Sequence, residues 1–238
     1  MARKYLIDIQ KKFKRLPAKG IFTRPKVILA SKSKKSRLVG KVLKQYSGLF
    51  STNDAVRIRE RVKNYLATLN LAGIATHETK IVLNPTRNGK YQLCMIQPEI
   101  AQQNILSNYL KTCSAEEAIS VFNQMIDNAR KVTQFNKANS IKIGLDPKPA
   151  NYAMVGGKVV QIDFYPPQIN GVGKKDSTMI TKHFRSRPLK IISKILKKPT
   201  QMITKDFINK RYNGEYLAIN IRRHFMKARP ELKRNWVN

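Results

Sequence analysis

One stretch of the chain, residues 141–168 (IKIGLDPKPANYAMVGGKVVQIDFYPPQ), concentrates the residues that could perform chemistry. Asp146 and Asn151 lie five residues apart, and Asp163 follows Asn151 by twelve residues, after a short apolar run. Carboxylate and amide oxygens are hard ligands of the kind that magnesium takes in phosphate-binding sites. An Asp, a Pro and an Asn in a loop also commonly form a turn, so the stretch alone fits both a structural turn and a site.

These oxygen ligands occur in a very basic chain. Of its 238 residues, 47 are Lys or Arg and 14 are Asp or Glu, which gives a formal net charge of +33. Such a charge favours a polyanionic partner or an anionic membrane surface. No helix-turn-helix, zinc-finger or single-strand-binding pattern accompanies it, so we expect any nucleic-acid contact to be made to the backbone and to depend on salt.

The cysteines and histidines suggest no further site. Cys94 and Cys113 are too few for a disulfide framework or a zinc site and favour a reducing compartment. His77, His183 and His224 are scattered, without the spacing of metal ligands. The N-terminus lacks an apolar signal core, and no uncharged apolar run approaches the roughly 20 residues that span a bilayer. We therefore expect a cytoplasmic protein without a transmembrane segment.

The elements that position the stretch begin with a hairpin and a helix. Short β-branched runs at 26–30 and 37–43, separated by a polar turn, predict two antiparallel strands. Residues 51–73 then combine candidate N-caps with apolar side chains at helical spacing, and Gly73 stands just beyond the last of them. This pattern predicts a helix.

A second hairpin and a long helix come next. Runs at 80–84 and 91–97 flank the turn sequence PTRNG and predict paired strands. Residues 115–135 start with acidic side chains, which favour a helix N-terminus, and carry an apolar face. That face consists of Ala118, Val121, Phe122, Met125, Ile126 and Ala129. A loop and then a strand at 158–164 complete this region.

The last part of the chain has mostly helical patterns, at 186–199 and 213–235. The first of these has an apolar stripe with lysines opposite. It fits a packed helix with a solvated basic face, and also a helix that lies on an anionic membrane.

The order and spacing of these features resemble the protein-kinase-like superfamily, which includes small-molecule kinases of the aminoglycoside phosphotransferase type. LDPKPAN is similar to the catalytic loop Asp-x-Lys-Pro-x-Asn, and QIDF is similar to the start of the metal-binding Asp-Phe-Gly motif. The resemblance implies an α+β fold with two lobes. A small antiparallel-sheet N-lobe would occupy 1–97, and a mostly helical, shortened C-lobe would occupy 98–238.

The resemblance also implies a role for each motif residue. Asp146 would be the catalytic base that orients the acceptor hydroxyl, and Lys148 would contact the transferring phosphoryl group. Asn151 and Asp163 would hold Mg²⁺ on the β- and γ-phosphates of ATP. In this scheme the catalytic loop covers 141–151, and the strand at 158–164 carries the metal-binding aspartate.

The resemblance extends upstream to the expected nucleotide-binding residues. Gly20 and Phe22 correspond to the phosphate-covering loop. Lys41 corresponds to the strand lysine that grips the α- and β-phosphates, and Glu60 to its ion-pair partner. Lys44, on the opposite face of the strand, competes with Lys41, because strand periodicity does not show which face meets a nucleotide. Lys41 and Glu60 also fit a solvated surface pair.

Several positions depart from the kinase pattern. Thr23 stands where the third glycine of the phosphate loop would be, and Tyr165 stands in place of the glycine after Asp-Phe. Gly144 and Leu145 replace the His-Arg that precedes the catalytic aspartate in most protein kinases, which makes control through an activation loop unexpected.

Two functions therefore stay open. The first is an ATP-dependent phosphotransferase that acts on a hydroxyl acceptor, a small molecule or a protein. The second is a catalytically weak or inactive kinase-like scaffold that binds a polyanion, such as nucleic acid, or an anionic membrane.

Overall fold

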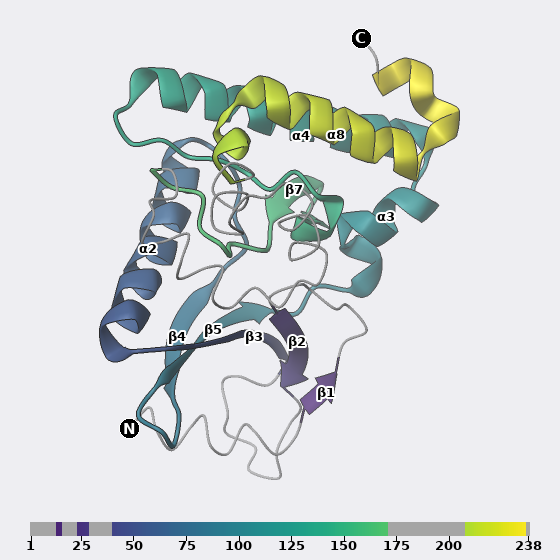
Figure 1. The fold of residues 1–238 in the computed structure, drawn as a ribbon. Coiled ribbons are helices and arrows are strands. Elements are labelled where there is room, and N and C mark those ends of the chain that lie inside the picture. The colour runs from purple at the N-terminus through teal and green to yellow at the C-terminus, as the bar shows by residue number, and fades with distance from the viewer. Residues whose placement is uncertain (1–12, 16–22, 29–39, 171–207, 237–238) are drawn as a thin grey trace, which may run out of the picture. The chain divides into compact units, whose positions relative to one another are not determined.

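The computed structural model describes residues 13–15, 23–28, 40–170 and 208–236 (Figure 1). These residues divide into two units. Unit 1 contains the described residues up to Lys63 together with Glu78–Glu99, and unit 2 contains Asn64–His77 and the described residues from Ile100 onward.

Unit 1 is built on a five-stranded sheet with the order β1-β2-β3-β5-β4. All neighbouring strands are antiparallel. The strands are β1 (Phe13–Arg15), β2 (Thr23–Ile28), β3 (Lys41–Phe50), β4 (Lys80–Pro85) and β5 (Tyr91–Pro98). The β2–β3 and β4–β5 pairs confirm the two strand pairings predicted from the sequence. Gly89, in the turn between β4 and β5, has a φ of 70°, a conformation that glycine adopts without steric cost.

Helix α2 (Thr52–Leu71) confirms the helix predicted at 51–73. Ser51 Oγ accepts a hydrogen bond from the Asp54 amide at 3.3 Å, which satisfies one of the free donors at the helix start. Ile58 and Val62, one turn apart, are fully buried, as the apolar spacing predicted. Gly73 follows the helix with a φ of 72°.

Helix α4 (Ala115–Ala138) is the longest helix that the structure describes, and it confirms the prediction at 115–135. A capping box begins it: Ser114 Oγ accepts from the Glu117 amide at 3.1 Å, and Glu117 Oε2 accepts from the Ser114 amide at 2.8 Å. Ala118, Val121, Phe122, Met125 and Ala129 form its buried face, whereas Ile126 is only half-buried.

Helix α8 (Gly214–Ala228) packs alongside α4 within unit 2 (Figure 1). The start of α8 comes very close to α4, because a Cβ on Gly214 would lie 3.0 Å from the Ala129 carbonyl oxygen. After α8, η4 (Pro230–Trp236) places Trp236 against Phe122, with 4.8 Å between the ring centroids. These elements confirm the helical prediction at 213–235, and the pattern at 186–199 lies outside the described residues.

A two-stranded hairpin follows the candidate catalytic loop. It joins β6 (Tyr152–Val155) to β7 (Lys158–Gln161) through Gly156 and Gly157, which have φ values of 55° and 75°. The strand predicted at 158–164 is therefore shorter than expected and ends before Asp163. Strand β6 was not predicted, although the Gly-Gly pair between two apolar runs is a hairpin signal.

The helix α3 (Leu106–Thr112) was also not predicted. It has only seven residues and two buried side chains, Leu106 and Leu110, too few to establish a periodicity in the sequence. With the sheet and the helices together, the protein has an α+β structure, as expected. Within the described parts of the chain, no helix has the length and apolar content needed to cross a membrane.

Candidate functional site

The loop that carries Asp146 runs between α4 and β6 and is held by the last turns of α4. Asn136 Nδ2 donates to the Ile143 carbonyl at 2.8 Å and to the Tyr212 carbonyl at 3.0 Å. The Ile143 amide donates in return to Asn136 Oδ1 at 2.8 Å. One side chain thus ties the start of the loop to α4 and to η3 (Lys210–Tyr212).

Asp146 forms an ion pair with a buried arginine. Arg211 Nη2 lies 2.9 Å from Asp146 Oδ2, and the Arg211 side chain is only 5 % exposed. Lys148 Nζ lies 3.9 Å from the same oxygen. The carboxylate that the sequence indicated as a catalytic base is therefore held between two cations, one buried and one about half-exposed.

Asn151 lies beside both Asp146 and the chain segment of Asp163. Asn151 Nδ2 makes a long hydrogen bond, 3.5 Å, to the Asp146 carbonyl. The Ile162 amide donates to the Asn151 carbonyl at 2.8 Å, which continues the β6–β7 pairing by one residue and ends immediately before Asp163. The structure therefore brings together three of the residues that the sequence predicted as a site.

Tyr65, on α2, links the two motif segments. Its hydroxyl donates to the Gly144 carbonyl at 2.7 Å. Gln161 Nε2 donates to the Tyr65 hydroxyl at 3.3 Å and to the Asp163 carbonyl at 2.9 Å. Burial raises the pKa of Tyr65, so its phenol stays protonated and keeps its role as a donor.

The backbone next to Asp146 makes a close contact that only glycine permits. A Cβ on Gly144 would lie 2.7 Å from the Arg211 carbonyl oxygen, well inside van der Waals contact. The Leu145 amide donates to the same carbonyl at 3.2 Å. The Gly144-Leu145 sequence, which departs from the kinase pattern, is thus the docking point of the segment that carries Arg211.

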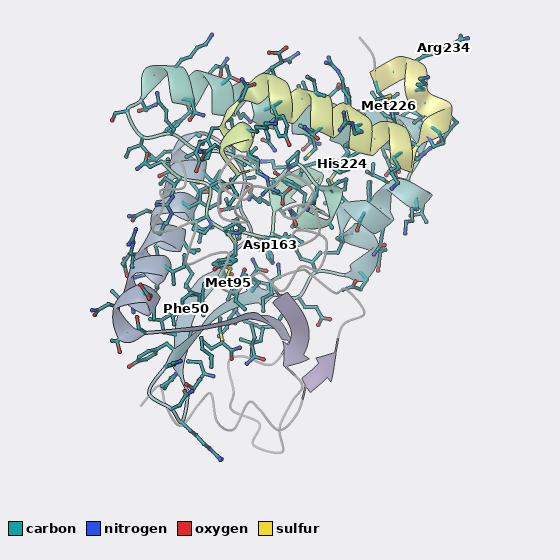
Figure 2. The ribbon with its side chains drawn as sticks, in the orientation of Figure 1. Phe50, Met95, Asp163, His224, Met226 and Arg234 are labelled. Atoms are coloured by element: carbon teal, nitrogen blue, oxygen red, sulfur yellow. The ribbon has the colours of Figure 1, made fainter. Side chains whose placement is uncertain are left out.

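His224, on α8, lies in the electrostatic surroundings of Asp146. Burial lowers the pKa of His224, and the cations of Lys148, Lys227 and Arg223 act in the same direction. Asp146 has the opposite effect on this pKa. Figure 2 labels His224 on α8 and Asp163 just beyond β7, both in unit 2.

Asn151 and Asp163 carry side-chain oxygens of the kind that magnesium binds together with phosphate and water. Within the described ranges, no group of three or more His, Cys, Asp or Glu side chains is arranged to hold a metal ion. Mg²⁺ commonly uses one or two protein carboxylates or amides together with substrate phosphates and water. Asn151 uses its amide nitrogen toward Asp146, which leaves its side-chain oxygen for such a role.

The predicted ion pair between Lys41 and Glu60 is not formed. Lys41 Nζ lies 3.7 Å from Glu78 Oε1, and Glu60 Oε1 pairs with Arg59 and Lys63 at 3.0 and 3.2 Å. The position of Glu60 around helix α2 explains why this pair does not form.

Glu60 lies two residues after the buried Ile58, and two residues correspond to about 200° around a helix. Its side chain therefore points away from the buried face, and it belongs to a solvated cluster on α2. The alternative, a solvated surface pair of Lys41 with Glu60, is not formed either, because each of the two pairs with other residues.

The other residues predicted to bind the nucleotide, in the phosphate-covering loop and on the strand that follows it, stay predictions. Gly20 and Phe22 lie outside the described residues. Lys41 and Lys44 are both half-buried on β3, opposite Pro98 and Met95 of β5, and this register does not choose between them.

Three residues of the site were missed from the sequence: Tyr65, Gln161 and Arg211. Tyr65 continues the apolar spacing of α2 and resembles an ordinary core residue. Gln161 precedes the Ile-Asp-Phe motif directly, and a polar residue at the end of an apolar strand was an available signal. Arg211 is one of many basic residues in its region, and nothing in its local sequence marks it.

The chain belongs to DUF6206, a family of unknown function, and the model of that family matches residues 19–236. A comparison with curated proteins finds no significant match.

Proposed function

We propose that this protein is an ATP-dependent phosphotransferase that moves the γ-phosphoryl group of MgATP to a hydroxyl acceptor, either a small molecule or a protein. One observation carries the proposal. Asp146, Asn151 and the Asp163 segment form one hydrogen-bonded unit, through the Asn151 side chain at 3.5 Å and the Asn151 carbonyl at 2.8 Å. A base and two metal-binding oxygens in one unit suit phosphoryl transfer.

The order of elements supports a two-lobed, kinase-like fold for this function. A strand that begins with Lys41, a helix, a hairpin, a long helix, the Asp146 loop and a short strand before Asp163 follow one another along the chain. This is the order that the resemblance to the kinase-like superfamily implies. Lys41 retains its proposed role in phosphate binding, without Glu60 as its partner.

The proposed roles follow from the chemistry of each side chain. Asn151 and Asp163 hold Mg²⁺, which neutralises charge on the phosphates. Asp146 orients the acceptor hydroxyl, and Lys148 contacts the phosphoryl group. The acceptor oxygen bonds to the γ-phosphorus while the bond from that phosphorus to the β–γ bridging oxygen breaks. ADP leaves with that electron pair, and the hydroxyl proton passes to Asp146 and then to solvent.

A second candidate is a kinase-like scaffold that binds a polyanion or an anionic membrane through its basic surface. The net charge of +33 favours it. In unit 2, Arg223, Lys227, Lys233 and Arg234 are exposed along α8 and η4. Both candidates are consistent with a cytoplasmic location, which the free thiols of Cys94 and Cys113 support.

Transfer of label from γ-labelled ATP tests the first candidate against the second. The full chain is incubated with labelled ATP, Mg²⁺ and a panel of hydroxyl-bearing acceptors, and parallel samples contain a chelator or the Asp163→Ala variant. We expect transfer that requires both Mg²⁺ and Asp163. Absence of both transfer and MgATP binding in the wild type would overturn the proposal and favour the scaffold.

A further inference from the structure

We propose that Arg211 is a positioning residue for Asp146 in this reaction, an inference that rests on the proposed function. Arg211 Nη2 donates to Asp146 Oδ2 over 2.9 Å. A charge-assisted hydrogen bond from a planar guanidinium is strong and directional, whereas the ammonium group of a lysine acts as a point charge. Arg211 therefore orients the carboxylate as well as balancing its charge.

The exposure of the three side chains shows how this orientation works. Arg211 is 5 % exposed, Asp146 21 % and Lys148 44 %, so Arg211 meets the carboxylate from the interior and Lys148 lies on the solvent side. Asp146 Oδ1 is enclosed and has no hydrogen-bond partner among the described residues. The accessible part of the carboxylate is thus on the Oδ2 side. One lone pair of Oδ2 accepts from Arg211, and the other is left for an acceptor hydroxyl.

The backbone of Arg211 is braced on two sides, as a positioning residue requires. Its carbonyl accepts from the Leu145 amide at 3.2 Å and lies so close to Gly144 that a Cβ there would be 2.7 Å away. The next residue, Tyr212, is bonded through its carbonyl to Asn136 of α4 at 3.0 Å. Groups that orient a reacting residue act well only when their own geometry is locked by packing and hydrogen bonds.

Arg211 does not belong to the motifs that predicted the site. It reaches Asp146 from η3, just before α8, and the fold brings the two together. The orientation of the proposed base thus depends on a distant part of the chain, and the docking of η3 on the Gly144-Leu145 backbone determines whether Asp146 points toward an acceptor.

The test compares Arg211→Lys and Arg211→Met with matched changes at Arg130, an exposed arginine on α4. Turnover is measured as labelled phosphate released to water from γ-labelled MgATP by the full chain, and unfolding is followed in urea. For Arg211→Lys we expect a folded protein, a KM for MgATP within about twofold of wild type, and a kcat lower by about 10- to 100-fold, because a misoriented base costs rate and not nucleotide affinity. Arg130→Lys and Arg130→Met should keep both constants.

A double variant covers the case in which Arg211→Met fails to fold. Removing Arg211 leaves Asp146 with less compensation, so Asp146→Asn combined with Arg211→Met should lose less stability than the two single changes added together. Additive losses would overturn the pairing. A wild type that neither binds nor hydrolyses MgATP would contradict both the proposed function and this inference. If the wild type is active and the Arg211→Lys variant has the wild-type kcat, only the positioning role of Arg211 is contradicted.

Discussion

The Tyr65 hydroxyl donates to the Gly144 carbonyl over 2.7 Å, which joins α2 to the loop two residues before Asp146. The same hydroxyl accepts from Gln161, whose amide also reaches the Asp163 carbonyl. A single buried phenol therefore couples the segments of the proposed base and the proposed metal ligand.

Replacing Tyr65 with Phe should destabilise the protein by about 1–3 kcal/mol, because the Gly144 carbonyl and the Gln161 amide each lose a buried partner. The change in the free energy of unfolding is measured by urea titration. The same replacement at the half-buried Tyr91, which lies on β5, should stay within about 0.5 kcal/mol. Equal effects at the two positions would show that the Tyr65 hydroxyl has no special role.

Asp163→Ala should abolish magnesium-dependent nucleotide binding, because it removes the carboxylate assigned to the metal. The measurement is the shift in thermal unfolding caused by MgATP. Asp127→Ala is the matched control, since Asp127 is half-exposed on α4 and its ion pair, at 2.7 Å, is with Lys131 one turn along the same helix. A thermal shift that persists unchanged in Asp163→Ala would remove Asp163 from the site.

Asp146→Asn should leave nucleotide binding largely intact and lower turnover by about 100-fold or more, since Asp146 is assigned to the acceptor hydroxyl. The change also removes the carboxylate charge that pairs with the buried Arg211, so we expect some loss of stability, of about 1–3 kcal/mol. Isothermal binding of MgATP and label transfer are measured on the same folded preparation. Wild-type turnover in the variant would exclude Asp146 as the base.

His224 should make stability depend on pH. Burial lowers the pKa of His224 in the folded protein, so the folded state binds fewer protons than the unfolded state just below the ordinary histidine pKa of about 6.5. This contribution to stability is present above about pH 6.5 and is lost as the pH falls through the folded pKa. Urea unfolding at about pH 7.5 and 5.5 should show a larger loss for the wild type than for His224→Gln. Parallel losses would contradict the assignment.

The basic sequences at 32–35 and 194–198 should bind polyanions separately from MgATP. Lys32, Lys34, Lys35, Lys194, Lys197 and Lys198 are to be neutralised together; all six lie outside the described residues. Heparin binding by the wild type should weaken by orders of magnitude as salt rises, while MgATP binding should change much less. The neutralised variant should lose heparin binding and keep MgATP binding. Loss of both in a folded variant would place these lysines within the nucleotide site.

The local elements were accessible from the sequence because their causes are local. Helix α4 starts at a capping box and buries the face that its apolar spacing marks, and the β4–β5 pair surrounds a glycine-containing turn. The β6–β7 hairpin was half missed, because Tyr152–Val155 is only four residues long and its burial does not alternate: the neighbours Tyr152 and Ala153 are both buried, whereas Val155 is exposed.

The sequence by itself determined helices α2, α4 and α8, the β2–β3 and β4–β5 pairs, and the grouping of Asp146, Asn151 and Asp163 in one stretch, since caps, periodicity and short spacings specify them. Only the tertiary structure decided which side chains meet across long separations. It paired Lys41 with Glu78, left Glu60 in a surface cluster on α2, and placed Arg211 on Asp146. Charge alone does not select such partners, because any lysine or arginine attracts a carboxylate and only the packed backbone determines which one comes within ion-pair distance.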